Sequence, residues 1–213
     1  VFDCMEADTL LIIGGHITDE NPVTDYIVRR IAAGRFMNVI IASARAMRLD
    51  SSATLVLRHS PAEEGALLTA FAEAVKGAPV DMALLKAAGV SADDVSAVAN
   101  KIRGSQSLAI FAGTEFLRFP NGLSGLSAFK DAAKTKVKKL GIMPALDRAN
   151  QRGAWEMGAH PWIGPGCNKT AARGCGTQGM LEAALEGGLD ALYIVGGDVV
   201  TEFPGEAFAR EAL

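Results

Sequence analysis

The stretch that decides the fold is Asp8-Thr-Leu-Leu-Ile-Ile-Gly-Gly-His-Ile-Thr-Asp-Glu-Asn-Pro22, and it returns as Asp190-Ala-Leu-Tyr-Ile-Val-Gly-Gly-Asp-Val-Val-Thr-Glu-Phe-Pro204. Shifted by 182 positions, the two copies share the first acid, the Gly-Gly pair, and the last Glu and Pro. Each copy is an apolar run that stops at two glycines, which is typical of a buried parallel strand entering a tight loop. The repeat therefore predicts two similar α/β units, each with a glycine-rich crevice at the carboxyl end of its sheet. Such crevices suit nucleotide-like ligands, or a fold that once held them.

The composition fits a globular α/β protein. Of the 213 residues, 49% are hydrophobic and 21% are charged, which is too apolar for a disordered chain. The formal net charge is −3 and no basic run exceeds residues 134–139, so we expect no nucleic-acid partner. No apolar run approaches the roughly 20 residues that span a bilayer, and no secretion signal is recognisable, so we expect no direct membrane insertion.

The residues that most often bind metals are few and scattered. They are Cys4, Cys167, Cys175, His16, His59 and His160. A zinc or iron–sulfur site needs about four ligands at ordered spacing, which this set does not supply. The sequence therefore predicts reduced thiols in a cytoplasmic protein and no metal site within the chain.

Strands and helices are expected to alternate along the chain. Apolar runs predict strands at 9–13, 38–42, 54–57, 108–112 and 191–195. Periodicity and capping residues predict helices at 23–33, 60–76, 78–89, 91–103, 123–140, 180–187 and from 205 onwards. This alternation predicts an α/β fold with a doubly wound, mostly parallel sheet and helices on both faces.

Changes in character along the chain suggest three regions. Residues 1–76 form a first α/β unit, and residues 77–140 form a connecting region of helices and a strand. Residues 141–213 combine an irregular glycine-rich stretch with a second, truncated α/β unit. Both ends look cut, so we expect a fragment of a longer subunit.

The two Gly-Gly pairs are the best-placed candidates for ligand binding, because each follows a predicted strand. Gly14, Gly15 and His16 end the first strand, and Gly196, Gly197 and Asp198 end its repeat. Either their backbone amides line a crevice, or glycine only permits the turn out of the strand.

Three further residues are candidates for the same crevice. Ser43 and Arg45 follow the second strand, where doubly wound sheets often contact the sugar or base of a nucleotide. Two interpretations of Arg45 stay open, binding of phosphate there or an ion pair on the surface. Two also stay open for Asn150, an amide contact with a ligand or a place in an ordinary turn.

Other motifs are weaker. Gly174-Cys-Gly-Thr-Gln-Gly179 has the G-x-G-x-x-G spacing, but no strand is predicted just before it, so it is interpreted as a loop and helix start. The sequence contains no nucleophile elbow and no phosphate-binding loop. The chain alone is therefore expected to perform no covalent chemistry.

Several segments resemble one known family. The first copy of the repeat, with Asn21-Pro22 and Arg29-Arg30, resembles the "AD-strand-G…hP…RR" segment of molybdopterin oxidoreductases. Residues 40–45 and 52–63 are similar to the next strand, "PR" turn and "PGTD" helix start of that family. The resemblance implies a fold like the middle domains of formate dehydrogenase and DMSO reductase.

The resemblance continues to the end of the chain. Residues 146–158 resemble the family's "N..Ga.d.G" stretch, and residues 179–204 resemble "Gm.ea…G..ka.yv.G.NP". Only residues 77–101 match weakly. Residues 149–158 are most similar to the G subunit of NADH-quinone oxidoreductase, the respiratory complex I.

The chain departs from the family at its ligand-binding positions. Ser43 stands where catalytic relatives carry an Asp that holds guanine, and the proline of the "PR" turn is replaced by Ala44. His16 and Asp198 replace the asparagine of "G.NP". The resemblance thus implies a pterin-dinucleotide crevice that is inherited as architecture and holds no ligand.

The resemblance implies a function as a fragment of the G subunit of NADH-quinone oxidoreductase, which passes electrons from NADH towards quinone. Iron–sulfur clusters would lie elsewhere in the full subunit, and the partners would be other subunits of a membrane-associated respiratory complex, on the cytoplasmic face of the inner membrane. One alternative is a fragment of an active molybdenum enzyme such as formate dehydrogenase, with bound molybdopterin guanine dinucleotide. Another is a nucleotide-binding or docking module without redox chemistry.

Overall fold

The computed structural model describes residues 6–34, 37–113, 116, 119, 121–146 and 150–213. It divides the chain into two compact units, Val1–Asp147 and Arg148–Leu213. One sheet of the first unit takes strands from both sides of residue 77, where the sequence suggested a boundary between regions. Cys4 lies outside the described residues.

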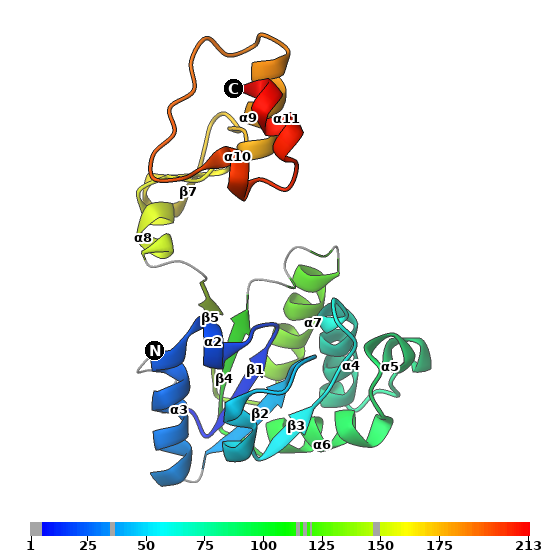
Figure 1. Ribbon diagram of the computed structural model, residues 1–213. Helices are drawn as coiled ribbons and strands as arrows, with labels where there is room; N and C mark the ends of the chain where they lie inside the picture. The colour runs from blue at the N-terminus through cyan, green and yellow to red at the C-terminus, as the bar shows by residue number, and fades with distance from the viewer. Residues whose placement is uncertain (1–5, 35–36, 114–115, 117–118, 120, 147–149) are drawn as a thin grey trace. The chain divides into compact units, whose positions relative to one another are not determined.

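The first unit is built on a five-stranded parallel sheet (Figure 1). The strands are β1 (Thr9–Ile13), β2 (Asn38–Ala42), β3 (Leu55–Leu57), β4 (Ser107–Gly113) and β5 (Lys139–Ala145), in the order β3-β2-β1-β4-β5. The repeat's first copy therefore supplies the central strand, and every residue of β1 is buried. The predicted strands at 9–13, 38–42, 54–57 and 108–112 are confirmed.

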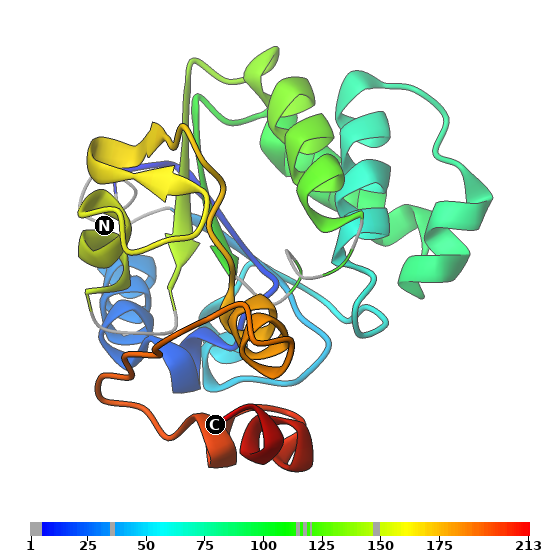
Figure 2. The ribbon, with the colours of Figure 1, turned by 90° about the horizontal axis from the view of Figure 1, so that it is seen from above.

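Helices cover both faces of this sheet, as predicted for a doubly wound fold. The side chains of Leu11 and Ile13 pack against one helical layer, and those of Leu10 and Ile12 against the other. The first layer contains α4 (Glu64–Lys76), α5 (Met82–Ala88), α6 (Ala92–Arg103) and α7 (Gly122–Lys134), of which α4 and α7 lie side by side (Figures 1 and 2). The second contains α3 (Pro22–Gly34) and the 3-10 helix η1 (Arg48–Ser52).

The helix predicted for residues 123–140 is wrong after residue 134. Helix α7 ends at Lys134, and Lys139 begins β5, a strand that the sequence did not predict. β5 lies at the edge of the sheet and is mostly exposed, so it lacks the continuous apolar run of a buried strand. Its Pro144 is compatible with an edge strand, where a missing backbone N–H costs little.

The second unit contains short elements only. They are α8 (Gln151–Glu156), β6 (Ile163–Gly164), the 3-10 helix η3 (Pro165–Cys167), β7 (Asn168–Lys169), α9 (Thr177–Leu185), α10 (Val199–Glu202) and α11 (Glu206–Ala212). β6 and β7 pair in an antiparallel hairpin. The strand predicted for residues 191–195 is wrong, because these residues belong to no strand. A second α/β unit is therefore not formed within residues 150–213.

Two further expectations concern the glycine-rich motif and the membrane. Helix α9 follows a loop and has Gly176 as its N-cap, which agrees with the interpretation of residues 174–179 as a loop and helix start. Among the described residues, none of the helices has both the length and the apolar character needed to cross a bilayer.

Candidate functional site

The two copies of the repeat have the same local structure after the Gly-Gly pair. Gly14 and Gly196 both adopt the left-handed conformation, with φ of 68° and 67°. A four-residue helix follows at the same offset in each copy: α2 (Ile17–Glu20) in the first and α10 in the second. The repeated residues thus encode a repeated turn, in which glycine supplies the positive φ.

The surroundings of the two turns differ. A Cβ atom on Gly14 would lie 2.1 Å from Cδ1 of Phe116, whereas one on Gly196 would meet nothing within 4 Å. A Cβ atom on Gly113, at the end of β4, would lie 1.7 Å from the Gly14 carbonyl oxygen. The strand order reverses between β1 and β4, where doubly wound sheets bind dinucleotides. Here the buried Phe116 ring lies against Gly14, and the backbones of Gly14 and Gly113 are in close contact.

A small pocket lies nearby, at the carboxyl ends of β1, β2 and β3. Five of the nine predicted site residues line it. The lining consists of Gly14, Gly15, His16, Ser43, Ala44, Arg45, His59 and Glu64. Its volume is about 40 Å³. That space suits a few water-sized groups, whereas pockets for cofactor-sized ligands measure roughly 300–1,000 Å³.

His16 lies at the wall of this pocket, with one hydrogen bond and one nearby carboxylate. Its Nε2 lies 3.1 Å from the carbonyl oxygen of Ala46, so Nε2 carries the proton and donates it. Its Nδ1 lies 2.8 Å from Oδ2 of Asp19, without the alignment of a hydrogen bond. His16 therefore fastens the Gly-Gly turn of β1 to the loop after β2.

His59 and Glu64 form the most polar part of the pocket. Nδ1 of His59 donates to the Ser60 carbonyl oxygen at 2.8 Å, which leaves Nε2 for another contact. It faces Oε1 of Glu64 at 3.9 Å, which is too long for a hydrogen bond. His59 Nε2 and Glu64 Oε2 are buried and have no hydrogen-bond partner among the described residues. A small polar group of the size of water, placed between them, would hydrogen-bond to both.

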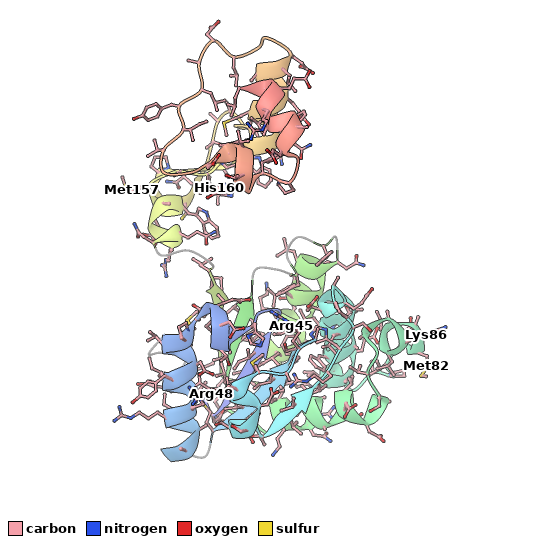
Figure 3. The ribbon with its side chains drawn as sticks, viewed as in Figure 1. Arg45, Arg48, Met82, Lys86, Met157 and His160 are labelled. Atoms are coloured by element: carbon pink, nitrogen blue, oxygen red, sulfur yellow. The ribbon has the colours of Figure 1, made fainter. Side chains whose placement is uncertain are left out.

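Ser43 and Arg45 contribute differently. The Ser43 hydroxyl accepts from the Arg45 backbone N–H at 3.4 Å, and its carbonyl oxygen accepts from Arg58 Nη1 at 3.2 Å. Ser43 is buried and shapes the loop after β2. Arg45 is exposed and lies at the carboxyl-terminal edge of the sheet (Figure 3).

The other four predicted site residues belong to the second unit. Asn150 has a left-handed φ of 58°, and its side chain covers Gly153, where an added Cβ would lie 2.2 Å from Asn150 Oδ1. Asp198 caps α10 by accepting from the backbone N–H groups of Val200 and Thr201 at 3.1 and 3.3 Å. The hydrogen bonds from Thr201 hold the pKa of Asp198 below its ordinary value. These contacts give Asn150, Asp198, Gly196 and Gly197 local structural roles.

Asp8, the first residue of the repeat, joins β1 to β4. Its carboxylate accepts from the backbone N–H groups of Gln106 at 2.8 Å and Ser107 at 3.0 Å. Burial opposes ionisation of Asp8, but these hydrogen bonds outweigh it, so the pKa lies below its ordinary value. Its counterpart Asp190 is exposed. The same acid therefore has a partner strand in the first copy only.

His59 and Glu64 were missed from the sequence. The signal was present, because His59 follows β3 closely and ligands bind outside the carboxyl ends of parallel strands. Glu64 lies in the first turn of α4, where an acid is also expected for its favourable interaction with the helix dipole. Across the described part of the chain, three or more His, Cys, Asp or Glu residues nowhere converge as a metal site would require.

Comparison with known proteins relates the chain to redox subunits. It is 32% identical over 238 residues to the G 2 subunit of NADH-quinone oxidoreductase from Rhizobium meliloti, which covers 97% of this chain and 28% of the relative. The chain is homologous to a segment of that subunit. It is also 26% identical over 249 residues to "NADPH-Fe(3+) oxidoreductase subunit alpha" of Geobacter sulfurreducens, across 97% of this chain and 29% of the relative. The chain thus spans less than a third of the length of these relatives.

The structural comparison concerns the fold alone. A chain of the formyltransferase/hydrolase complex of Methylorubrum extorquens, solved with methylofuran, superimposes with a TM-score of 0.52 at 14% identity. The match covers 72% of this chain and 40% of the other. No family model matches the sequence. The doubly wound α/β fold is confirmed.

Proposed function

We propose that this chain is a scaffold segment of the G subunit of an NADH-quinone oxidoreductase. The full subunit would pass electrons from NADH towards quinone through iron–sulfur clusters that are bound outside residues 1–213. The observation that carries the proposal is the 32% identity to the Rhizobium meliloti G 2 subunit across 97% of the chain. The parallel sheet with helices on both faces agrees with the expected molybdopterin-oxidoreductase-like architecture.

The segment is proposed to act without a cofactor of its own. A pterin dinucleotide would need the space above Gly14 at the point where the strand order reverses, and the Phe116 ring occupies that space. The adjoining pocket of about 40 Å³ is much smaller than a dinucleotide. The residues of the first unit therefore do not fit the group. The glycines act instead as the places where two backbones approach closely.

The proposed partners are the other subunits of a membrane-associated respiratory complex. Through them the subunit would lie on the cytoplasmic face of the inner membrane without entering it. Catalysis of quinone reduction would belong to the assembled complex, of which this chain would supply a scaffold segment.

The test is to express the full-length subunit from its gene and to isolate the complex that contains it. We expect NADH:quinone oxidoreductase activity to co-purify, with iron but no molybdenum in the subunit. Stoichiometric molybdenum would favour the alternative of an active molybdenum enzyme. A polypeptide that purifies alone, without iron and without activity, would contradict the proposal and favour a docking module.

A binding measurement tests the filled crevice separately. We expect GDP, used as a guanine nucleotide probe, to show no binding up to millimolar concentration. Micromolar binding of GDP that Phe116→Trp abolishes would show that the crevice is open and would contradict the proposed absence of a cofactor.

A further inference from the structure

The pocket at the carboxyl ends of β1, β2 and β3 contains two buried polar atoms that point to a ligand. The side chain of His59 is fully buried, and that of Glu64 is 10% exposed. Both residues line the pocket. His59 Nε2 and Glu64 Oε2 have no hydrogen-bond partner among the described residues. Because buried polar atoms are nearly always paired, a small group bound in the pocket is the natural partner of both.

The negative charge of Glu64 is the stronger of the two requirements. A buried carboxylate is costly unless an opposite charge or several hydrogen-bond donors compensate it. Glu64 is the first residue of α4, where the helix dipole supplies the equivalent of about half of a positive elementary charge. The dipole therefore compensates the carboxylate in part only.

The arginines near the pocket do not supply the missing charge. Arg58 is held in an ion pair with Asp50. Arg45 is exposed at the rim, where water screens its charge (Figure 3). In the part of the chain that the structure describes, neither arginine forms an ion pair with Glu64, and the one basic atom within 4 Å of its carboxylate is His59 Nε2, at 3.9 Å. A cation bound in the pocket would complete the compensation.

The size of the pocket and its donor set limit the kind of cation. The volume of about 40 Å³ is enough for about three water-sized groups, since each needs roughly 10–15 Å³. A divalent metal ion needs three or more His, Cys, Asp or Glu ligands, and the described residues contain no such group. The remaining class is a small monovalent cation that binds by donating hydrogen bonds.

We propose that this pocket binds an ammonium ion, which donates hydrogen bonds to the Glu64 carboxylate and to Nε2 of a neutral His59 ring. His59 Nε2 and Glu64 Oε1 are 3.9 Å apart, so one nitrogen atom can lie about 2.9 Å from both. His59 Nδ1 donates to the Ser60 carbonyl oxygen, so the lone pair of the neutral ring is at Nε2. Ammonium has the size of water and also carries the charge that Glu64 requires. This inference is independent of the proposed function.

Urea unfolding of the 1–213 chain in different chloride salts tests the inference. At about 200 mM salt, we expect the folding equilibrium constant to be at least about threefold higher in ammonium chloride than in sodium chloride, because a ligand of one heavy atom with a Kd of about 100 mM or lower stabilises the folded state by that factor. Potassium chloride should resemble sodium chloride, because potassium has no hydrogen to donate. An effect of potassium equal to that of ammonium, or no effect of ammonium, would overturn the inference.

A pair of neighbouring substitutions separates binding in the pocket from a general salt effect. Glu64→Gln removes the buried charge and should abolish the advantage of ammonium over sodium. Glu63→Gln is the matched control, because Glu63 is partly exposed and does not line the pocket, and it should retain the advantage. An advantage that persists in Glu64→Gln would contradict the inference.

Two further measurements on the unsubstituted chain decide the matter if Glu64→Gln does not fold. Tetramethylammonium is too large for the pocket and should give no advantage over sodium; an advantage as large as that of ammonium would contradict the inference. Magnetisation transfer from the protons of 15N-labelled ammonium to the ring protons of His59 should be observed by NMR. Transfer from water alone would make water the occupant and would overturn the inference, while the proposed function, which is tested by co-purified activity, would be unaffected.

Discussion

The two copies of the repeated phrase are identical at seven of fifteen positions and form the same turn, but only the first contains a strand. Residues 8–22 form the central strand of a five-stranded sheet, whereas residues 190–204 contain the same left-handed glycine and short helix after an unpaired segment. The turn forms in both because it depends on backbone conformation within a few residues. The strand forms in one because its hydrogen bonds and its buried faces come from distant parts of the chain.

The largest expected contrast lies at the centre of the two apolar runs. Leu11→Asp should lower the free energy of unfolding of the 1–213 chain by about 4 kcal/mol or more, since it buries a charge in the core. Tyr193→Asp, at the matching exposed position, should change it by less than about 0.5 kcal/mol. Urea unfolding measures both. Equal losses would mean that residues 191–195 are already packed in this chain.

Substitutions of Gly14 and Gly196 are expected to differ less in their effect on the free energy of unfolding. Gly14→Ala should destabilise the chain by about 3 kcal/mol, because it adds left-handed strain to a clash with Phe116. Gly196→Ala should cost about 1 kcal/mol, from strain alone. The difference between the two midpoints in urea isolates the packing against Phe116. If Gly14→Ala were no more harmful than Gly196→Ala, the crevice between β1 and β4 would not be filled.

The smallest expected difference in stability is between substitutions of Asp8 and Asp190, and it depends on pH. Asp8→Asn should cost about 1–2 kcal/mol at pH 7 through weakened hydrogen bonds to the backbone of β4, whereas Asp190→Asn should be neutral. The pKa of Asp8 is lowered in the folded state, so its contribution is present above its unfolded value and is lost as pH falls through the folded value. The difference between wild type and Asp8→Asn should therefore shrink under acid. A difference that grew on acidification would contradict this assignment.

The sequence predicted the elements whose determinants are local and strongly apolar. β1 and β2 match their predicted bounds because each is a continuous apolar run buried on both faces. β5 was missed because an edge strand with Gly141, Pro144 and an exposed lysine has no such run. Residues 191–195 were wrongly assigned because strand pairing depends on partners that the local sequence does not contain.

The candidate site was also predicted only in part, because some of its contacts come from distant parts of the chain. Gly14, Gly15, His16, Ser43 and Arg45 meet in one pocket because the carboxyl ends of parallel strands share one edge of the sheet. The packing of the Phe116 ring against Gly14 could not be foreseen, since that residue comes from beyond β4 and no local pattern marks it. Asn150 and Asp198 were predicted as site residues; in the structure Asn150 lies in a turn and Asp198 caps α10.

Amide hydrogen exchange on the 1–213 chain tests the central claim most directly, namely that the repeated sequence encodes the turn locally while the strand needs neighbours. We expect the amides of residues 10–13 to be protected by a factor of about a thousand or more, and those of residues 192–195 to exchange at nearly the unfolded rate. Equal protection of both segments in the monomeric chain would contradict the account.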